Sequence, residues 1–257
     1  MKLFKFLKKD KIHRSFSDNA INICQEDLEQ VKCHINGKNN TINIERLGAT
    51  CKGSIELYVN GDNNEILIEK NLFIGSKLII TIGRIHKNFG PISNTKVTIG
   101  KNSSIGSCTI ITYNSNSKIS IGENCMFAFN TFLFNTDAHP IINKETNQII
   151  NKVKNMKIGN HVWIGANVNI LKNSIIPDDS IIGLGSVVSG DYSQKGSGKW
   201  GYIIAGNPAK IIRDNITWNE NGSGEYVQNS LTDAISGGVT FLRSGYNDYI
   251  SHYKVAA

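Results

Sequence analysis

The most regular hydrophobic pattern in the chain lies between residues 158 and 188. Aliphatic side chains recur there at intervals of six residues, at Ile158, Ile164, Ile170, Ile176, Ile182 and Val188, and a glycine directly follows three of them. An interval of six fits neither an amphipathic helix, with its period of 3.6, nor a strand that alternates every two residues. It is the interval of hexapeptide solenoids, in which each hexad forms one short flat face and a tight turn. Three such faces close a triangular coil, and stacked coils bury the aliphatic positions in a continuous core.

The same interval continues, less regularly, toward the N-terminus. It appears at Ile68, Ile74 and Ile80, at Ile99, Ile105 and Ile111, and at Ile121, Phe127 and Leu133. The segment "NGKNNTINI" at 36–44 also recurs as "NGDNNEILI" at 60–68, with Asn and Gly at corners where left-handed backbone angles are tolerated. We therefore predict an all-β solenoid over residues 34–213. A solenoid needs caps, so residues 1–33 are expected at one end, and 214–257 cap the other end or contribute to specificity.

Two interruptions break the pattern, at about 135–156 and about 190–202. In a solenoid such insertions emerge from the faces as loops and commonly carry function. The first contains "NTDAHP", which places His139 two residues after Asp137. The second, "GDYSQKGSGKWGY", is rich in Gly, Ser and Lys.

Charge and cysteine content narrow the function classes. The net charge of +7 and pI of about 9.1 favour anionic partners such as phosphates or acidic glycans, whereas nothing resembles a nucleic-acid-binding motif. The five cysteines form no C-x-x-C pair, which argues against a disulfide framework or zinc ribbon and favours a reducing, cytoplasmic location. The basic N-terminus (residues 1–14) has two open interpretations: a short amphipathic helix that contacts the inner face of a membrane, or a cap packed on its own protein.

Three motifs together resemble a known enzyme family. They are "KIGNHVWIGANVNILKNSIIPDDSIIGLGSVVSG" at 157–190, "IIAGNPAKIIR" at 203–213 and "DAHPI" at 137–141. They are similar to the left-handed β-helix acyltransferases, hexapeptide-repeat enzymes that use acetyl-CoA. Within that family they resemble the branch that O-acetylates bacterial capsular polysaccharides, sialic acids and O-antigen sugars. The resemblance is strong over 135–213, fair over 34–134 and absent at both ends.

The resemblance implies a left-handed parallel β-helix, a homotrimer with active sites between neighbouring subunits, acetyl-CoA as donor and no metal. It also implies that His139 is the general base that takes a proton from the attacking sugar hydroxyl, which suits a side chain titrating near neutral pH. Asp137 either orients that imidazole or faces the acceptor. Trp163 either lines the acetyl or acceptor pocket or packs between subunits. The backbone N–H groups near Gly165 and Ala166 are candidate oxyanion donors.

The remaining expectations concern acetyl-CoA. Lys210 and Arg213 match family positions near its phosphate-bearing end. Ala166, Leu184, Ser189 and Gly190 match positions that line the pantetheine groove, with Gly165 beside them and Asn167 and Lys172 as further candidates on the same face. The sequence departs from the family pattern after Val188, where "SGDY" opens a longer loop, and this departure puts Ser189 and Gly190 in doubt.

Other functions are weighed against the O-acetyltransferase. N-acetylation of an amino- or nucleotide-sugar would use the same helix and histidine, although the "DAHPI" loop favours the O-acetyl branch. A zinc carbonic anhydrase on this fold needs three histidines at one metal, two of them close in sequence, and the six histidines here include no such pair. A non-catalytic glycan-binding solenoid is the most distant alternative.

Overall fold

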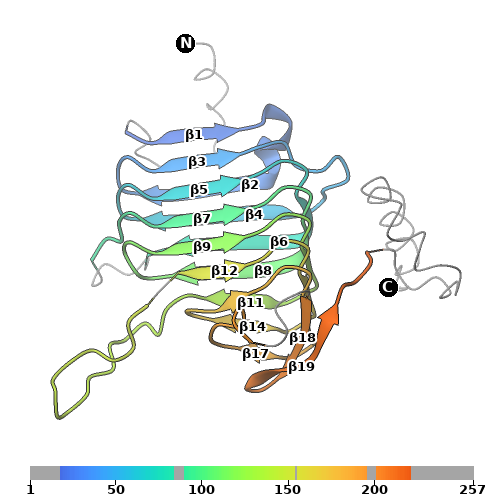
Figure 1. Cartoon of the computed structure of the whole chain (residues 1–257). Coiled ribbons are helices and arrows are strands. Elements are labelled where there is room, and N and C mark those ends of the chain that lie inside the picture. Colours follow the sequence, from blue (N-terminus) through green and yellow to red (C-terminus); the bar gives the residue numbers. More distant parts are fainter. Residues whose placement is uncertain (1–17, 84–89, 154, 196–200, 221–257) are drawn as a thin grey trace, which may run out of the picture. The chain divides into compact units, whose positions relative to one another are not determined.

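Parallel strands stacked coil upon coil make up most of the regular secondary structure in the part of the chain that the structure describes (Figure 1). The structure is a computed structural model, and it describes residues 18–83, 90–153, 155–195 and 201–220. The chain divides into one unit of Met1–Thr217 and a second of Trp218–Ala257. Only residues 218–220 of the second unit are described, so the fold below is that of the first unit.

Three flat faces make up each coil. Face A is a seven-stranded parallel sheet: β1 (Ala20–Ile23), β3 (Thr41–Ile44), β5 (Glu65–Ile68), β7 (Lys96–Ile99), β9 (Lys118–Ile121), β12 (Met156–Ile158) and β15 (Ile175–Ile176). The other two faces form one bent sheet, because β6 (Phe73–Ile82) and β8 (Ser104–Thr112) run around the edge between them.

Face B begins with the first residues of β6 and β8. It continues through β10 (Met126–Phe127), β13 (Trp163–Ile164), β16 (Ile181–Ile182) and β18 (Gly201–Gly206). Face C contains β2 (Val31–Asn36), β4 (Ser54–Asn60), the later residues of β6 and β8, β11 (Thr131–Phe134), β14 (Asn169–Leu171) and β17 (Val187–Val188). One short 3-10 helix, η2 (Gln25–Gln30), links β1 to β2. Within the described residues, no helix is long and apolar enough to span a membrane.

The core runs along the inside of the coils, as the six-residue interval predicts. The inward positions of faces A, B and C in one coil are Ile158, Ile164 and Ile170, and each is at most 1% exposed. The next coil repeats the arrangement with Ile176, Ile182 and Val188. Burying such side chains contributes roughly 1.5–3 kcal/mol each, so the stacked aliphatic columns are the main source of stability.

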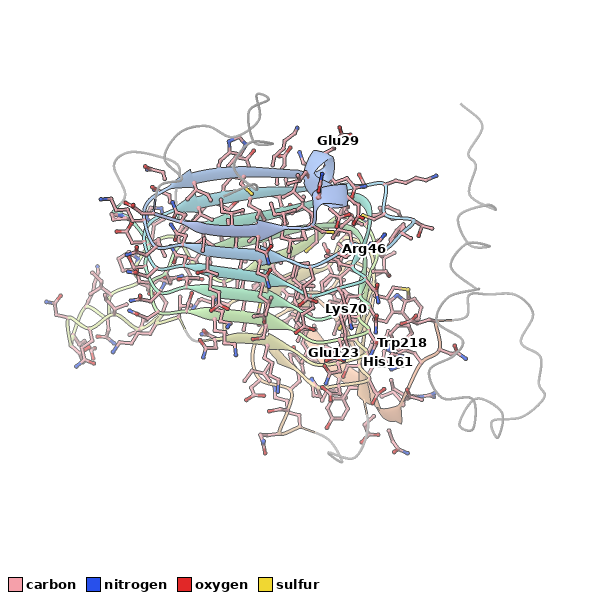
Figure 2. All side chains as sticks on the ribbon, turned by 90° about the horizontal axis from the view of Figure 1, so that it is seen from above. Glu29, Arg46, Lys70, Glu123, His161 and Trp218 are labelled. Carbon is pink, nitrogen blue, oxygen red and sulfur yellow. The ribbon has the colours of Figure 1, made fainter. Side chains whose placement is uncertain are left out.

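Asparagine at the corners explains the high asparagine content. Most of the non-glycine residues with positive φ are asparagines, among them Asn71 (61°), Asn102 (57°) and Asn124 (55°). These three occupy one edge of the helix, where the side-chain amide of Asn71 donates to Asn102. Asparagine tolerates the left-handed conformation better than other residues with a Cβ. Figure 2 labels Arg46, Lys70, Glu123 and His161, which belong to turns of the same edge.

The ends of the helix differ from the predicted boundaries of 34 and 213. Parallel pairing begins with β1, whose Ala20–Ile23 pairs in register with Thr41–Ile44 of β3. At the other end, β18 is joined to β19 (Ala209–Ile216) as an antiparallel hairpin rather than as another parallel coil. The predicted caps lie mostly outside the described residues, as does part of the predicted loop at 190–202.

Candidate active site

The chain leaves the helix between Phe134 of β11 and Met156 of β12 and forms an extended arm, visible at the lower left of Figure 1. The arm is a narrow hairpin. The amide of Asn143 donates to the carbonyl of Gln148 (2.9 Å), and the amide of Ile150 donates to that of Ile141 (2.9 Å). Four of its isoleucines are about half exposed or more: Ile141, Ile142, Ile149 and Ile150.

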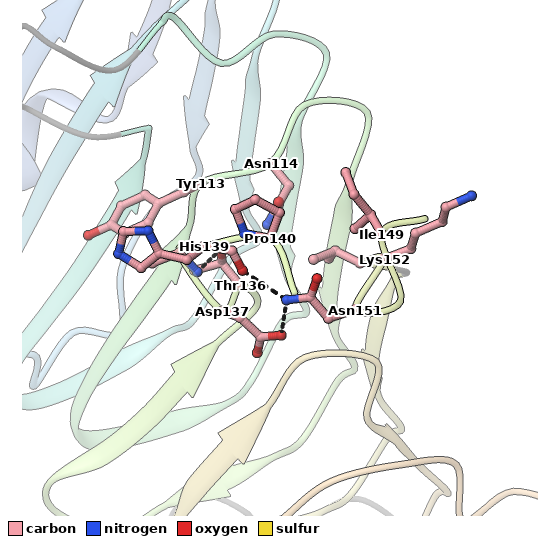
Figure 3. A pocket seen from close by; sticks show the side chains of 11 residues that line it. Tyr113, Asn114, Thr136, Asp137, His139, Pro140, Ile149, Asn151 and Lys152 are labelled. Atoms are coloured by element: carbon pink, nitrogen blue, oxygen red, sulfur yellow. Dashed lines mark hydrogen bonds between the residues drawn. The ribbon is translucent and has the colours of Figure 1, made fainter. Parts of the chain in front are cut away.

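A pocket of about 240 Å³ lies where this arm joins the helix (Figure 3). Its lining includes Tyr113, Thr136, Asp137, His139 and Asn151. A tight turn presents the histidine: Ala138 has a φ of 62°, its amide donates to Thr136 Oγ1 (2.9 Å), and the amide of His139 donates to the Asp137 carbonyl (2.7 Å). His139 is exposed, so its imidazole is open to an incoming substrate.

The Asp137 carboxylate holds the arm and not the imidazole. Its Oδ2 accepts a hydrogen bond from the Asn151 side-chain amide (2.7 Å) and lies 3.1 Å from Lys172 Nζ. The same Asn151 amide donates to the His139 carbonyl (2.9 Å), and Asn151 Oδ1 accepts from the amide of Ile141. Figure 3 shows the His139 ring on the side of the pocket lined by Tyr113, with the Asp137 carboxylate directed away from it. The expected contact from Asp137 to the imidazole is therefore not made in this structure.

The sequence predicts that Lys172 lies on the surface that binds acetyl-CoA. In the structure its side chain contacts the loop that carries His139. Its side chain is only 19% exposed and is paired with Asp137, so it belongs to the support of the His139 loop. Ser189 and Gly190 follow β17, whose register with β14 brings them beside Leu171 and Lys172. These three candidates thus share the edge between faces C and A with His139.

The other candidates gather at the edge between faces B and C. Trp163 points outward from β13 and is 39% exposed. It lies in a row with Ile181 and Ile203, and Ile203 is paired with Arg213 across the β18–β19 hairpin. At the adjoining turn, Leu184 is 75% exposed. The neighbouring Gly183 packs against Ala205, which is the strand partner of Lys210.

Gly165, Ala166 and Asn167 form the turn between faces B and C. A Cβ on Gly165 would lie 2.8 Å from the amide nitrogen of Leu184, so the close stacking of two coils requires glycine there. The Gly165 amide donates to the Ile182 carbonyl (2.9 Å), which removes it as an oxyanion donor. The corresponding role of Ala166 stays a prediction. Asn167 is exposed and continues the corner asparagines, with its Oδ1 3.4 Å from Asn130 Nδ2.

Face C therefore separates two groups of candidate residues within the chain, which we call half-sites. The His139 half-site lies at the edge with face A, and the Trp163 half-site, with Lys210 and Arg213, lies at the edge with face B. Lys172 follows Asn167 by five positions of largely extended chain, which is roughly 16 Å at about 3.3 Å per residue. A thioester bound beside Asn167 would therefore lie roughly 16 Å from the edge that carries His139.

Several contributors to the pocket were not predicted from the sequence. Tyr113 and Thr136 line it with His139, and Asn114 donates a hydrogen bond to the carbonyl of Asn135 at its base (2.8 Å). Tyr113 follows β8 in the preceding coil, and irregular coil lengths in this region hide which residues stack on each other. One signal was present in the sequence. The segments "YNSN" at 113–116 and "FNTD" at 134–137 share the order aromatic residue, Asn, Ser or Thr, and Asn or Asp, which suggests equivalent corners.

Two cysteines of the repeat, Cys108 and Cys125, were expected to be buried in the coils. Both are buried, and burial raises the pKa of the Cys108 thiol to about 12. A thiol with that pKa is not a nucleophile near neutral pH. Among the described residues, no group of three or more His, Cys, Asp or Glu side chains is placed to bind a metal ion.

Known proteins resemble this chain over much of its length, although no family model matches it. A polysialic acid O-acetyltransferase of Neisseria meningitidis is 36% identical over 194 residues, which cover 71% of this chain and 86% of that protein. A polysialic acid O-acetyltransferase of Escherichia coli O1:K1 is 34% identical over 151 residues, 56% of this chain but only 47% of that protein's length.

A solved structure of a protein with the same activity name also resembles this chain in its fold. The polysialic acid O-acetyltransferase OatWY superimposes with a TM-score of 0.61 at 30% identity, covering 84% of this chain and 92% of that one. The predicted left-handed parallel β-helix is thus confirmed. The chain belongs to the family of β-helix O-acetyltransferases that includes the polysialic acid O-acetyltransferases.

Proposed function

We propose that the protein transfers an acetyl group from acetyl-CoA to a hydroxyl of an acidic bacterial capsular polysaccharide, with polysialic acid as the first acceptor to test. The observation that carries the proposal is the exposed His139 imidazole, presented by a braced turn in a pocket at the base of the arm, in a chain of this family. The net charge of +7 fits an anionic acceptor and an anionic donor.

The chemistry follows from the nature of the two substrates. The thioester is already activated, whereas a sugar hydroxyl is a poor nucleophile until a base takes its proton. A nitrogen of the His139 ring accepts that proton as the oxygen attacks the thioester carbonyl. When the tetrahedral species collapses, the carbon–sulfur bond breaks and the imidazolium returns the proton to the leaving thiolate. One acetyl ester and one free CoA thiol result, and the histidine ends neutral as it began.

The donor is assigned to the Trp163 half-site. Trp163, Ile181 and Leu184 offer partly exposed apolar surface for the pantetheine arm, and the exposed cations Lys210 and Arg213 suit the phosphates. Ala166 remains a candidate oxyanion donor at the same turn. Ser189 and Gly190 stay candidates for the end of pantetheine that approaches His139.

The separation of the two half-sites supports the further proposal of an oligomer. We assign the complete active site to the junction of two subunits in a homotrimer, where the face A–C edge of one subunit meets the face B–C edge of the next. The exposed isoleucines of the arm support this arrangement, since apolar surface of that kind is commonly covered by a partner.

The same proposal places the enzyme in the cytoplasm, where acetyl-CoA is available, with at most peripheral contact of residues 1–14 with the inner membrane face. All five cysteines are free thiols, which fits a reducing compartment. Residues 1–17 lie outside the described residues.

The direct test is release of CoA thiol in the presence of acetyl-CoA and a panel of capsular polysaccharides, with mass spectrometry of the glycans. We expect O-acetyl esters on an acidic polymer. His139→Ala should lower kcat by at least a hundredfold, as is typical for loss of a general base. It should leave the melting temperature and acetyl-CoA affinity unchanged, because the ring is exposed. Full activity of that variant, or modification of amines alone, would refute the proposal.

A further inference from the structure

A second hollow, of about 190 Å³, lies on face C in the N-terminal coils, apart from the His139 pocket. It is lined by residues of β2 and β4 and by the turn after β6: His34, Ile35, Asn36, Tyr58, Val59, Asn60 and Gly83. None of these residues contributes to either half-site described above. The hollow nevertheless lies toward the same edge of the helix as His139, because the ends of β2, β4, β6, β8 and β11 all meet that edge.

The strand register of face C gives the distance between this hollow and the loop that carries His139. Tyr58 pairs with Thr81, Thr81 with Ile111, and Ile111 with Phe134, which is the last residue of β11. Three spacings of about 4.8 Å between neighbouring strands place the start of the His139 loop roughly 14 Å from Tyr58. An extended glycan of several sugar units spans such a distance, whereas a single sugar at His139 does not.

The hollow contains an aromatic wall. The rings of His34 and Tyr58 are stacked across the two strands, with centroids 4.7 Å apart and planes 7° from parallel. The next residue in the row is Thr81, so among the described residues no third ring stacks on Tyr58. Aromatic faces pack well against the C–H faces of sugar rings, because both surfaces are apolar while their rims are polar. The Tyr58 hydroxyl is held in place by donating to Glu56 Oε2 (3.2 Å).

Amides line the hollow, and a cluster of charged side chains lies beside it on the same strands of face C and on β6. The side-chain amide of Asn36 donates to Asn60 Oδ1 (2.7 Å), and both residues line the hollow. Amide side chains offer donors and acceptors suited to sugar hydroxyls. Two lysines flank Glu56: Lys77 Nζ lies 2.9 Å and Lys32 Nζ 3.5 Å from its carboxylate. The hydrogen bond from Lys77 lowers the pKa of Glu56, so the cluster of two cations and one anion keeps a net positive charge.

We propose that this hollow is a distal subsite that binds a sugar unit of the acceptor polysaccharide while another unit of the same chain reacts at His139. The inference rests on the proposed function and extends it, because it adds a second site of contact with the acceptor polymer, away from His139. Stacking on Tyr58 and hydrogen bonds to Asn36 hold the distal unit, and Lys32 and Lys77 attract its carboxylate.

The test compares long and short acceptors with the full-length protein. Long-chain polysialic acid and sialic acid dimers are each titrated with saturating acetyl-CoA. For Tyr58→Ala we expect the KM for the long chain to rise about tenfold, with the loss of one stacked ring. We expect its KM for the dimer, its KM for acetyl-CoA and its kcat to match wild type. Tyr58→Phe keeps the ring and should retain long-chain affinity to within about twofold.

A matched pair of amide variants controls for nonspecific effects. Asn22 donates to Asn43 on face A with almost the same geometry (2.9 Å) as Asn36 to Asn60 on face C. Asn36→Ala should raise the KM for the long chain, and Asn22→Ala should not. Equal effects of the two variants would overturn the subsite. So would equal KM changes for long chain and dimer in Tyr58→Ala, or a changed oligomeric mass of that variant, which would make the hollow a subunit contact.

A binding experiment without acetyl-CoA distinguishes failure of the proposed acetyl transfer from failure of the subsite. If wild type acetylates no polymer, polysialic acid is titrated in the absence of acetyl-CoA by calorimetry. Binding that weakens about tenfold in Tyr58→Ala but not in Asn22→Ala would still support the subsite. Equal affinities, or no binding by wild type, would overturn it.

Discussion

At the scale of single residues, Asp137 is the side chain whose role the geometry defines most sharply. In a triad, the aspartate contacts the imidazole, and its replacement by asparagine lowers kcat about 10⁴-fold. Here the Asp137 carboxylate contacts Asn151 and Lys172 instead. Asp137→Asn should therefore lower kcat/KM by no more than about fivefold, through loosening of the His139 turn, because a partly exposed ion pair contributes at most about 1 kcal/mol.

A double-mutant cycle on Asp137 and Lys172 distinguishes two roles of Asp137: support of the His139 turn and orientation of the imidazole. Lys172→Met should cause a similar loss of kcat/KM. The double variant should be little worse than either single variant, because Asp137, Asn151 and Lys172 act as one support. Steady-state kinetics on one acceptor are sufficient for the measurement. A 10⁴-fold loss in Asp137→Asn together with a harmless Lys172→Met would show that the carboxylate orients the imidazole during turnover.

Some residues of the candidate site could be predicted from the sequence and others could not. His139 was predicted because a motif placed it in an interruption of the repeat, and the structure presents it in a pocket. The partners of Asp137 were not predicted, since Asn151 lies at the far end of the arm and Lys172 in the next coil. Their meeting depends on the path of the arm, and a repeat pattern carries no information about that path.

At the scale of elements, the corner glycines determine how closely coils stack. A Cβ on Gly122 would lie 2.4 Å from the backbone carbonyl oxygen of Gly159 in the adjacent coil. That oxygen cannot move without separating the β9 and β12 strands. Gly122→Ala should destabilise the protein by about 3 kcal/mol, the upper part of the usual range for overpacking. The melting temperature should fall by roughly 6–12 °C, which thermal unfolding followed by circular dichroism would measure.

Gly90→Ala provides the matched control, since within the described part of the chain a Cβ at Gly90 meets no atom within 4 Å. Its melting temperature should lie within about 1 °C of wild type. If Gly122→Ala melted as wild type does, the coils would not be as closely stacked as the structure has them.

Strand positions were predictable wherever the hexad was regular, because one aliphatic residue per face suffices to define an inward column. Prediction failed at the two ends for different reasons. β1 contributes only Ile21 and Ile23 before the helical linker η2, which is too little for a repeat to be visible. At the other end "IIAGNPAKIIR" keeps an aliphatic spacing while the chain reverses between Gly206 and Ala209. A spacing cannot reveal a reversal of direction.

At the scale of the whole molecule, the active site is predicted to require two subunits. Each subunit contributes the His139 half-site at one edge of face C and the Trp163 half-site at the other. A closed ring of identical subunits joins unlike edges at every junction, which is the head-to-tail geometry of cyclic oligomers. A defect in one half-site of a subunit then disables only the junction that uses that half-site, and this property can be tested without knowing the interface in detail.

Mixing two inactive variants provides that test. His139→Ala lacks the base, and Trp163→Ala combined with Lys210→Ala lacks most of the proposed donor site. If the two are co-expressed in equal amounts, a junction works only where an intact histidine edge meets an intact donor edge. Random assembly of a cyclic oligomer makes about one quarter of the junctions intact. Purified mixed oligomers should thus show about a quarter of wild-type thiol release, while each variant alone shows almost none. Activity no greater than the sum of the two separate variants would place both half-sites in one subunit, and the roughly 16 Å across face C would then have to be crossed by movement of the arm.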